Sequence, residues 1–195
     1  MLFRSAVEVS GIGKGSSVLV TGGAGGVGHY AIQFAKARGA TVLTTISGDA
    51  KADLARKAGA DHCINYRTEN VGERVMAATA KKGVDAVIDM DFSSNAKLAP
   101  AILHPRSRFV VYGNSQPEAT IPSQFMLTNF IGIQYIFVYE LTAQERASAV
   151  NGINKMLEGK SLINNVALTL PLAEIHAAHE AVEQGKALGN VVVTL

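Results

Sequence analysis

The chain has little cysteine, little net charge and no long apolar run, and each shortage excludes a class of protein. One cysteine among 195 residues, Cys63, excludes an internal disulfide and a cysteine-rich zinc site. Lys and Arg outnumber Asp and Glu only by 18 to 16, too small a surplus to indicate nucleic acid or an anionic membrane as partner. No apolar run approaches the ~20 residues of a membrane span, and no basic segment followed by an apolar one begins the chain. A cytoplasmic protein without a nucleic-acid or membrane partner is expected.

Glycine, in contrast, is concentrated in one short turn. Five glycines fall between positions 22 and 28, after an apolar segment at 17–20 and before an amphipathic segment that begins at about Val27. A turn without side chains lets backbone N–H groups approach a pyrophosphate, and the dipole of the following helix favours the same anion. A glycine-rich loop without a ligand is the alternative, but the strand before and the helix after favour a dinucleotide site. The pyrophosphate is predicted to lie on Ala24, Gly25, Gly26 and Val27.

The rest of the chain alternates short apolar segments with amphipathic ones. Such alternation predicts an α/β fold with a doubly wound parallel sheet (a Rossmann fold) of strand order 3-2-1-4-5-6. Three parts are expected: a helix within 1–16, a dinucleotide-binding domain over 17–160, and a C-terminal strand–helix–strand extension over 161–195. Further strands are expected at 40–45, 62–65, 84–90, 109–112, 132–139, 165–170 and 191–195. Further helices are expected at 49–58, 70–80, 96–103, 142–158 and 172–184.

The same turn also fits short-chain dehydrogenases, which need a Tyr-x-x-x-Lys pair for proton transfer. The residues four positions after the five tyrosines are Phe34, Asn70, Gln116, Tyr139 and Ala143. None is lysine, so this class is excluded.

A second class matches along nearly the whole chain. The matching motifs are Val18–Gly28, Leu54–Asp61, Ile64–Arg67, Gly83–Asp89, Val111–Gly113, Pro171–His179 and Gly185–Val193. In this order they resemble the zinc-independent medium-chain dehydrogenases/reductases, and more narrowly the NADPH:quinone oxidoreductases, or zeta-crystallin-like proteins. Two segments depart from the family pattern: His104–Arg108 replaces a Pro-Gly-Gly-like turn, and Met90–Asn95 replaces a Val-Gly-Gly.

The resemblance implies an activity and a missing part. It implies hydride transfer from NADPH to a quinone or an α,β-unsaturated carbonyl, with neither metal nor flavin. It also implies that residues 1–16 match the helix after an N-terminal catalytic domain, so that domain is expected to be absent from this chain. No catalytic residue is assigned. The alternative is a non-catalytic NADP(H)-binding module, a redox sensor or a structural protein in the manner of a lens crystallin.

The choice of NADP(H) over NAD(H) rests on charge. An NAD site usually has an acid at the end of the second strand, where this chain reads Thr44–Ser47. Asp49, a little further on, is interpreted as a helix N-cap. A lysine at position 51 opposes the helix dipole unless an anion is bound there. The resemblance places the 2′-phosphate on Ser47, Lys51 and Tyr66. A solvated lysine and a tyrosine that anchors a strand end are the alternatives.

The resemblance also places cofactor contacts at Tyr112, Gly113 and Asn114, and the nicotinamide beside Ile136, Phe137 and Val138. The strand expected at 132–139 would form an edge of the sheet, and exposed apolar edges favour pairing. A homodimer through this edge is therefore expected, the alternative being a monomer whose edge is covered by 117–128.

Three histidines are candidates for a role in a site. His29 is expected either to border the cofactor or to lie on the surface. His176 and His179 are interpreted as an ordinary helix face, with His179 packed against the sheet, rather than as a metal site.

Overall fold

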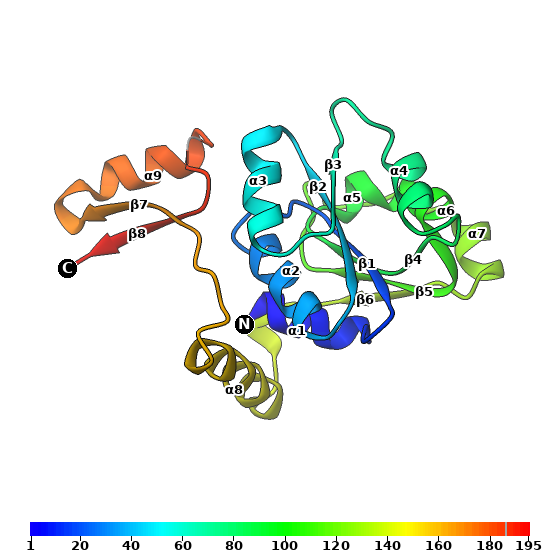
Figure 1. Cartoon of the computed structure of the whole chain (residues 1–195), viewed down its shortest axis with the longest axis horizontal. Coiled ribbons are helices and arrows are strands. Elements are labelled where there is room, and N and C mark those ends of the chain that lie inside the picture. The colour runs from blue at the N-terminus through cyan, green and yellow to red at the C-terminus, as the bar shows by residue number, and fades with distance from the viewer. Residues whose placement is uncertain (186) are drawn as a thin grey trace.

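A computed structural model describes residues 1–185 and 187–195 and shows a parallel sheet between two layers of helices, followed by a C-terminal arm (Figure 1). The six strands pair in the order β3-β2-β1-β4-β5-β6, as the doubly wound pattern predicts. Their bounds are β1 Ser17–Val20, β2 Thr41–Ile46, β3 His62–Asn65, β4 Val84–Asp89, β5 Leu103–Val111 and β6 Gly132–Tyr135. The order reverses between β1 and β4, and ligands of such sheets bind at the carboxyl ends of these two strands.

Helices bury both faces of the sheet, which is why its strands read as apolar runs without alternation. Val18 and Val20 pack with α1, α2 and α3 on one face, whereas Leu19 packs with α4, α6 and α7 on the other. The helices are α1 Leu2–Ser10, α2 Gly28–Ala37, α3 Asp49–Lys57, α4 Val71–Ala78, α5 Phe92–Asn95, α6 Ala99–Ile102, α7 Ser123–Thr128 and α8 Ala143–Glu158. No helix among the described residues is long and apolar enough to cross a membrane.

The second half of the sheet differs from the expected boundaries. The helix expected at 96–103 is divided into a 3-10 turn at Ala96–Leu98 and α6, because Pro100 cannot donate a backbone hydrogen bond and is tolerated only in the first turn of a helix. β5 begins at Leu103, not at 109, and its pairing with β4 contains a register shift. β6 ends at Tyr135, where its pairing with β5 ends, so the expected strand over 132–139 is too long. The capping box of α8 is present as expected, with Glu145 N donating to Thr142 Oγ1 at 3.2 Å.

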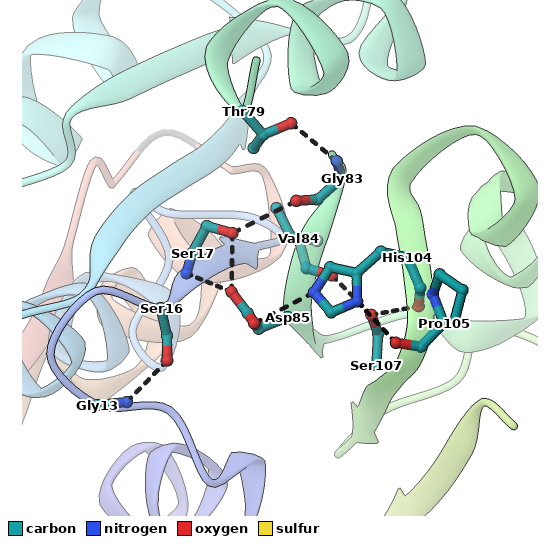
Figure 2. A network of polar contacts seen from close by, with 10 residues as sticks. All are labelled: Gly13, Ser16, Ser17, Thr79, Gly83, Val84, Asp85, His104, Pro105 and Ser107. Atoms are coloured by element: carbon teal, nitrogen blue, oxygen red, sulfur yellow. Dashed lines mark hydrogen bonds and ion pairs between the residues drawn. The ribbon is translucent and has the colours of Figure 1, made fainter. Parts of the chain in front are cut away.

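Figure 2 shows a polar network at the amino ends of three strands, far from the carboxyl ends where a ligand is expected. Asp85 of β4 accepts hydrogen bonds from Ser17 N at 2.7 Å and Ser17 Oγ at 3.0 Å, and His104 Nε2 lies 3.1 Å from its other oxygen. Burial raises the pKa of Asp85, but these hydrogen bonds outweigh burial and hold it below its usual value. The serine bonds to the aspartate and not to the histidine, so this is a strand clamp and not a nucleophilic triad.

The C-terminal arm contains β7 (Val166–Pro171), α9 (Ile175–Glu183) and β8 (Asn190–Thr194), and its two strands pair in parallel. α2 holds the segment that leads into it. Gln33 accepts from Ile163 N at 2.7 Å and donates to Ile163 O at 3.0 Å. His29 Nε2 lies 3.0 Å from the same carbonyl, and His29 is 1% exposed. The expectation that His29 lies on the surface is therefore wrong, because its buried ring contacts the segment that leads into the arm. That His29 borders the cofactor stays a prediction. The division at 160/161 stays a prediction.

Candidate nucleotide site

Two cavities lie side by side at the carboxyl ends of β1 and β4. The first has a volume of about 700 Å³ and the second about 580 Å³. The first extends from the glycine turn toward the end of β2 and the start of α3, and the second extends from the turn toward α1 and the end of β5. This is the position at which a doubly wound sheet binds a dinucleotide.

The glycine turn between β1 and α2 forms the floor of both cavities. Gly25 and Gly26 are exposed, and over residues 1–185 and 187–195 the N–H groups of Gly26 and Val27 have no hydrogen-bond partner. These free donors lie at the N-terminus of α2, where the helix dipole also attracts an anion. A Cβ on Gly28 would collide with the carbonyl of Gly22, so this position must be glycine for the helix to follow the strand closely. Such a cradle fits a pyrophosphate.

The first cavity brings together the three residues assigned to a 2′-phosphate. Ser47, Lys51 and Tyr66 all line it, together with Ala24 and Gly25 of the turn. Lys51 lies in the first turn of α3, where its charge is unfavourable to the helix dipole unless an anion is near. The N-cap of this helix is Gly48 and not Asp49, which is the first helical residue. The interpretation of Asp49 as the cap is therefore wrong by one position.

Two carboxylates at the end of β4 differ in environment. Asp89 is fully buried and accepts hydrogen bonds from Thr21 Oγ1 at 2.7 Å and Asn95 Nδ2 at 2.8 Å, while its Oδ2 has no partner within the described residues. Burial raises the pKa of Asp89 above its usual value. For Asp91 the effect of burial is outweighed by hydrogen bonds from Ser93 and Ser115, which hold its pKa well below the usual range. Asp91 thus places a fixed negative charge on the wall of the first cavity.

Four residues that line the first cavity were not predicted from the sequence: Met90, Asp91, Asn95 and Lys97. The signal that could have found the first three was the departure of Met90–Asn95 from the family's Val-Gly-Gly, which replaces small residues by larger side chains. No such signal marks Lys97.

The C-terminal arm contributes further cavity-lining residues that were not predicted from the sequence. Ala187, Leu188 and Gly189 line the first cavity and Asn190 lines the second. A Cβ on Gly26 would come within 3.0 Å of Asn190 Oδ1, so this amide lies directly over the turn. No local pattern signals this contact, since it joins segments more than 160 residues apart.

The remaining predicted residues divide into two groups. Gly26, Val27 and Tyr112 line the second cavity. The others line neither cavity: Gly113, Asn114, Ile136, Phe137 and Val138.

The residues that line neither cavity have other contacts. A Cβ on Gly113 would collide with the carbonyl of Met90, and Asn114 Oδ1 accepts from Ser93 N at 2.9 Å. Ile136 N donates to Val111 O at 2.9 Å, which extends the β5–β6 pairing by one bond, while the Phe137 ring packs edge-on against Tyr139.

A metal site is not formed by the part of the chain that the structure describes, where no group of three or more His, Cys, Asp or Glu side chains gathers. His176 pairs with Glu180 on the exposed face of α9 at 3.4 Å. His179 is exposed, so its expected packing against the sheet is wrong. The reason is that α9 covers only the two-stranded sheet of the arm.

Comparison with known proteins agrees with this geometry. Residues 26–154 match the family described as zinc-binding dehydrogenase, although the described residues offer no donor set for zinc. A 2-haloacrylate reductase from Burkholderia sp. is 30% identical over 187 residues, which are 92% of this chain and 55% of that protein. A quinone oxidoreductase from Pseudomonas aeruginosa is 28% identical over 98% of this chain and 59% of its own length.

A solved structure extends the likeness to the whole fold. Escherichia coli quinone oxidoreductase complexed with NADPH superimposes with a TM-score of 0.83, at 27% identity over 100% of this chain and 63% of that one. A structure of 2-haloacrylate reductase superimposes with a TM-score of 0.87, at the same identity and coverage. The chain thus spans a little over half the length of the relatives it matches. By the family match, the fold and the glycine turn, the chain belongs to the zinc-binding dehydrogenase family of medium-chain dehydrogenases/reductases.

Proposed function

We propose that the chain binds NADP(H) across the two cavities. The observation that carries the proposal is that Ser47, Lys51 and Tyr66 share one cavity with the glycine turn. In this arrangement the 2′-phosphate contacts these three side chains, and the pyrophosphate contacts the backbone from Ala24 to Val27. The nicotinamide lies in the second cavity beside Tyr112, with Gly113, Asn114 and the segment 136–138 closing that end of the cleft.

The proposed reaction is hydride transfer to a quinone or an α,β-unsaturated carbonyl, without metal or flavin. The bound nicotinamide supplies the hydride, and this chain's residues bind it, orient it and exclude water from one side. The names of two relatives, a quinone oxidoreductase and a 2-haloacrylate reductase, support this class of acceptor. No residue of this chain is assigned as proton donor.

A second candidate is a non-catalytic NADP(H)-binding module, a redox sensor or a structural protein. The chain matches only 55% and 59% of those two relatives, so a part that they use in catalysis can lie outside it.

The two candidates separate in one experiment on the 195-residue chain. NADPH binding is measured by calorimetry, and NADPH oxidation is then followed with 9,10-phenanthrenequinone. We expect binding together with quinone-dependent oxidation. Binding without oxidation would favour the module, and absence of binding would reject both.

We further propose that two copies pair through the β6 edge. Tyr135 at the end of β6 is 60% exposed, and Phe137 and Tyr139 just beyond the strand are 64% and 76% exposed. Exposed apolar surface beside an unpaired strand edge favours pairing. α7, the helix within the 117–128 segment, leaves these side chains exposed. A cytoplasmic location stays a prediction.

Sedimentation tests the pairing. A mass near twice 20.5 kDa is expected at micromolar concentration, shifting toward 20.5 kDa in Gln134→Lys, which places a charge on the edge. Gln124→Lys puts the same charge on α7 and should leave the mass unchanged. A wild-type mass of 20.5 kDa, or a Gln134→Lys variant that stays at twice that, would show that β6 is not the interface.

A further inference from the structure

The half-exposed side chain of Met90 lies between the two cavities at the carboxyl ends of β1 and β4. Among the described residues only Gly22, Gly25 and Met90 line both of them. The two glycines have no side chain, so the thioether of Met90 is what separates one cavity from the other. Met90 is 49% exposed although it is apolar and lies at the centre of the cleft, directly after β4.

The backbone of Met90 is held firmly. Its N–H donates to Thr21 Oγ1 at 3.0 Å, and its carbonyl lies where a Cβ on Gly113 would be. Its side chain is not held in the same way. The sulfur lies against the Cα of Gly22, at the place a Cβ would occupy, and methionine has three rotatable bonds beyond a fixed backbone. The thioether can therefore leave this position while the main chain stays in place.

The glycine turn is also where a pyrophosphate would cross from one cavity to the other. A ligand that occupies both cavities has to pass Gly22 and Gly25, and the sulfur of Met90 lies against Gly22. A ligand confined to the first cavity does not meet this obstacle, because Ser47, Lys51 and Tyr66 lie at its far end.

We propose that Met90 is a movable partition that selects between half-length and full-length nucleotides. This rests on the proposed NADP(H) site. With the side chain over Gly22, the first cavity accepts an adenosine 2′,5′-bisphosphate unit by itself. A dinucleotide spans both cavities only after the thioether rotates off the turn, and part of its binding free energy is used for that rearrangement.

Calorimetry with two ligands tests the partition. In Met90→Ala the affinity for NADPH should rise by roughly threefold to tenfold, the range expected when one side-chain rearrangement is no longer needed. The affinity for adenosine 2′,5′-bisphosphate should stay unchanged. In Met90→Phe, whose ring is larger and stiffer, NADPH should bind more weakly while the half-length ligand binds as before.

Leu188→Ala is the matched control, since it shortens an apolar side chain that lines only the first cavity. It should change the two affinities by the same factor. NADPH affinity that stays equal or falls in Met90→Ala would overturn the partition. Failure of both ligands to bind the wild-type chain would instead reject the proposed NADP(H) site.

A second readout follows the side chain itself. The chain has five methionines, and with ¹³C-methyl labelling the resonance missing from Met90→Leu identifies Met90. NADPH should shift this resonance more than the others, whereas adenosine 2′,5′-bisphosphate should leave it nearly in place. Equal shifts with both ligands would contradict a rearrangement specific to the dinucleotide.

Discussion

Replacing Gly26 by valine is expected to weaken NADPH binding by more than tenfold, or about 1.4 kcal/mol. The branched side chain would occupy the space above the turn where the pyrophosphate is proposed to lie, beside the free N–H groups of Gly26 and Val27. The fold should survive, because the nearest obstacle to a Cβ at this position is the Asn190 side-chain oxygen at 3.0 Å and not backbone. Calorimetry measures the affinity, and circular dichroism checks the fold.

Gly13→Val is the matched control. A Cβ on Gly13 meets nothing within 4 Å, and the residue lies before β1 and outside both cavities. This variant should bind NADPH as the wild type does. Unchanged affinity in a folded Gly26→Val variant would refute the placement of the pyrophosphate.

Replacing Lys51 by alanine is expected to weaken NADPH binding by about tenfold to a hundredfold and to leave NADH binding nearly unchanged. Only NADPH carries the 2′-phosphate, and a hydrogen bond to a charged group contributes about 1.5–3 kcal/mol. The loss should shrink at high salt, since the lysine is partly exposed and its charge is screened.

Lys57→Ala removes the same charge from the other end of α3, where it lines neither cavity. It should affect both cofactors little. Equal losses for NADPH and NADH in Lys51→Ala would show that this lysine does not contact the phosphate.

The part of the fold that depends on local patterns was predictable. Strand β3 lies at 62–65 as expected, and α8 begins at the predicted capping box. The strand order followed from the alternation of strands and helices. In the site, the same local logic located the glycine turn, whereas Ser47, Lys51 and Tyr66 came from the family resemblance. All three line one cavity with the turn.

What could not be predicted depends on contacts between distant segments. His29 is buried because Ile163, which lies 134 residues later, presents its carbonyl to the ring. Asn190 reaches the glycine turn because the arm folds back on α2. β6 stops at Tyr135 because its partner β5 ends there, which no feature of residues 132–139 themselves indicates.

The sheet order also determines when the centre of the molecule can form during synthesis. β1 pairs with β2 on one side and with β4 on the other, and its clamp joins Ser17 to Asp85, 68 residues later. At 5–20 residues per second the ribosome needs roughly 3 to 14 seconds to make that stretch. Through this interval β1, β2 and β3 form at most a half-sheet in which β1, with the apolar residues Val18 to Val20, lacks its partner β4. The nascent chain is therefore most exposed to misassociation in the window before β4 emerges, and a stall between residues 21 and 84 would prolong it.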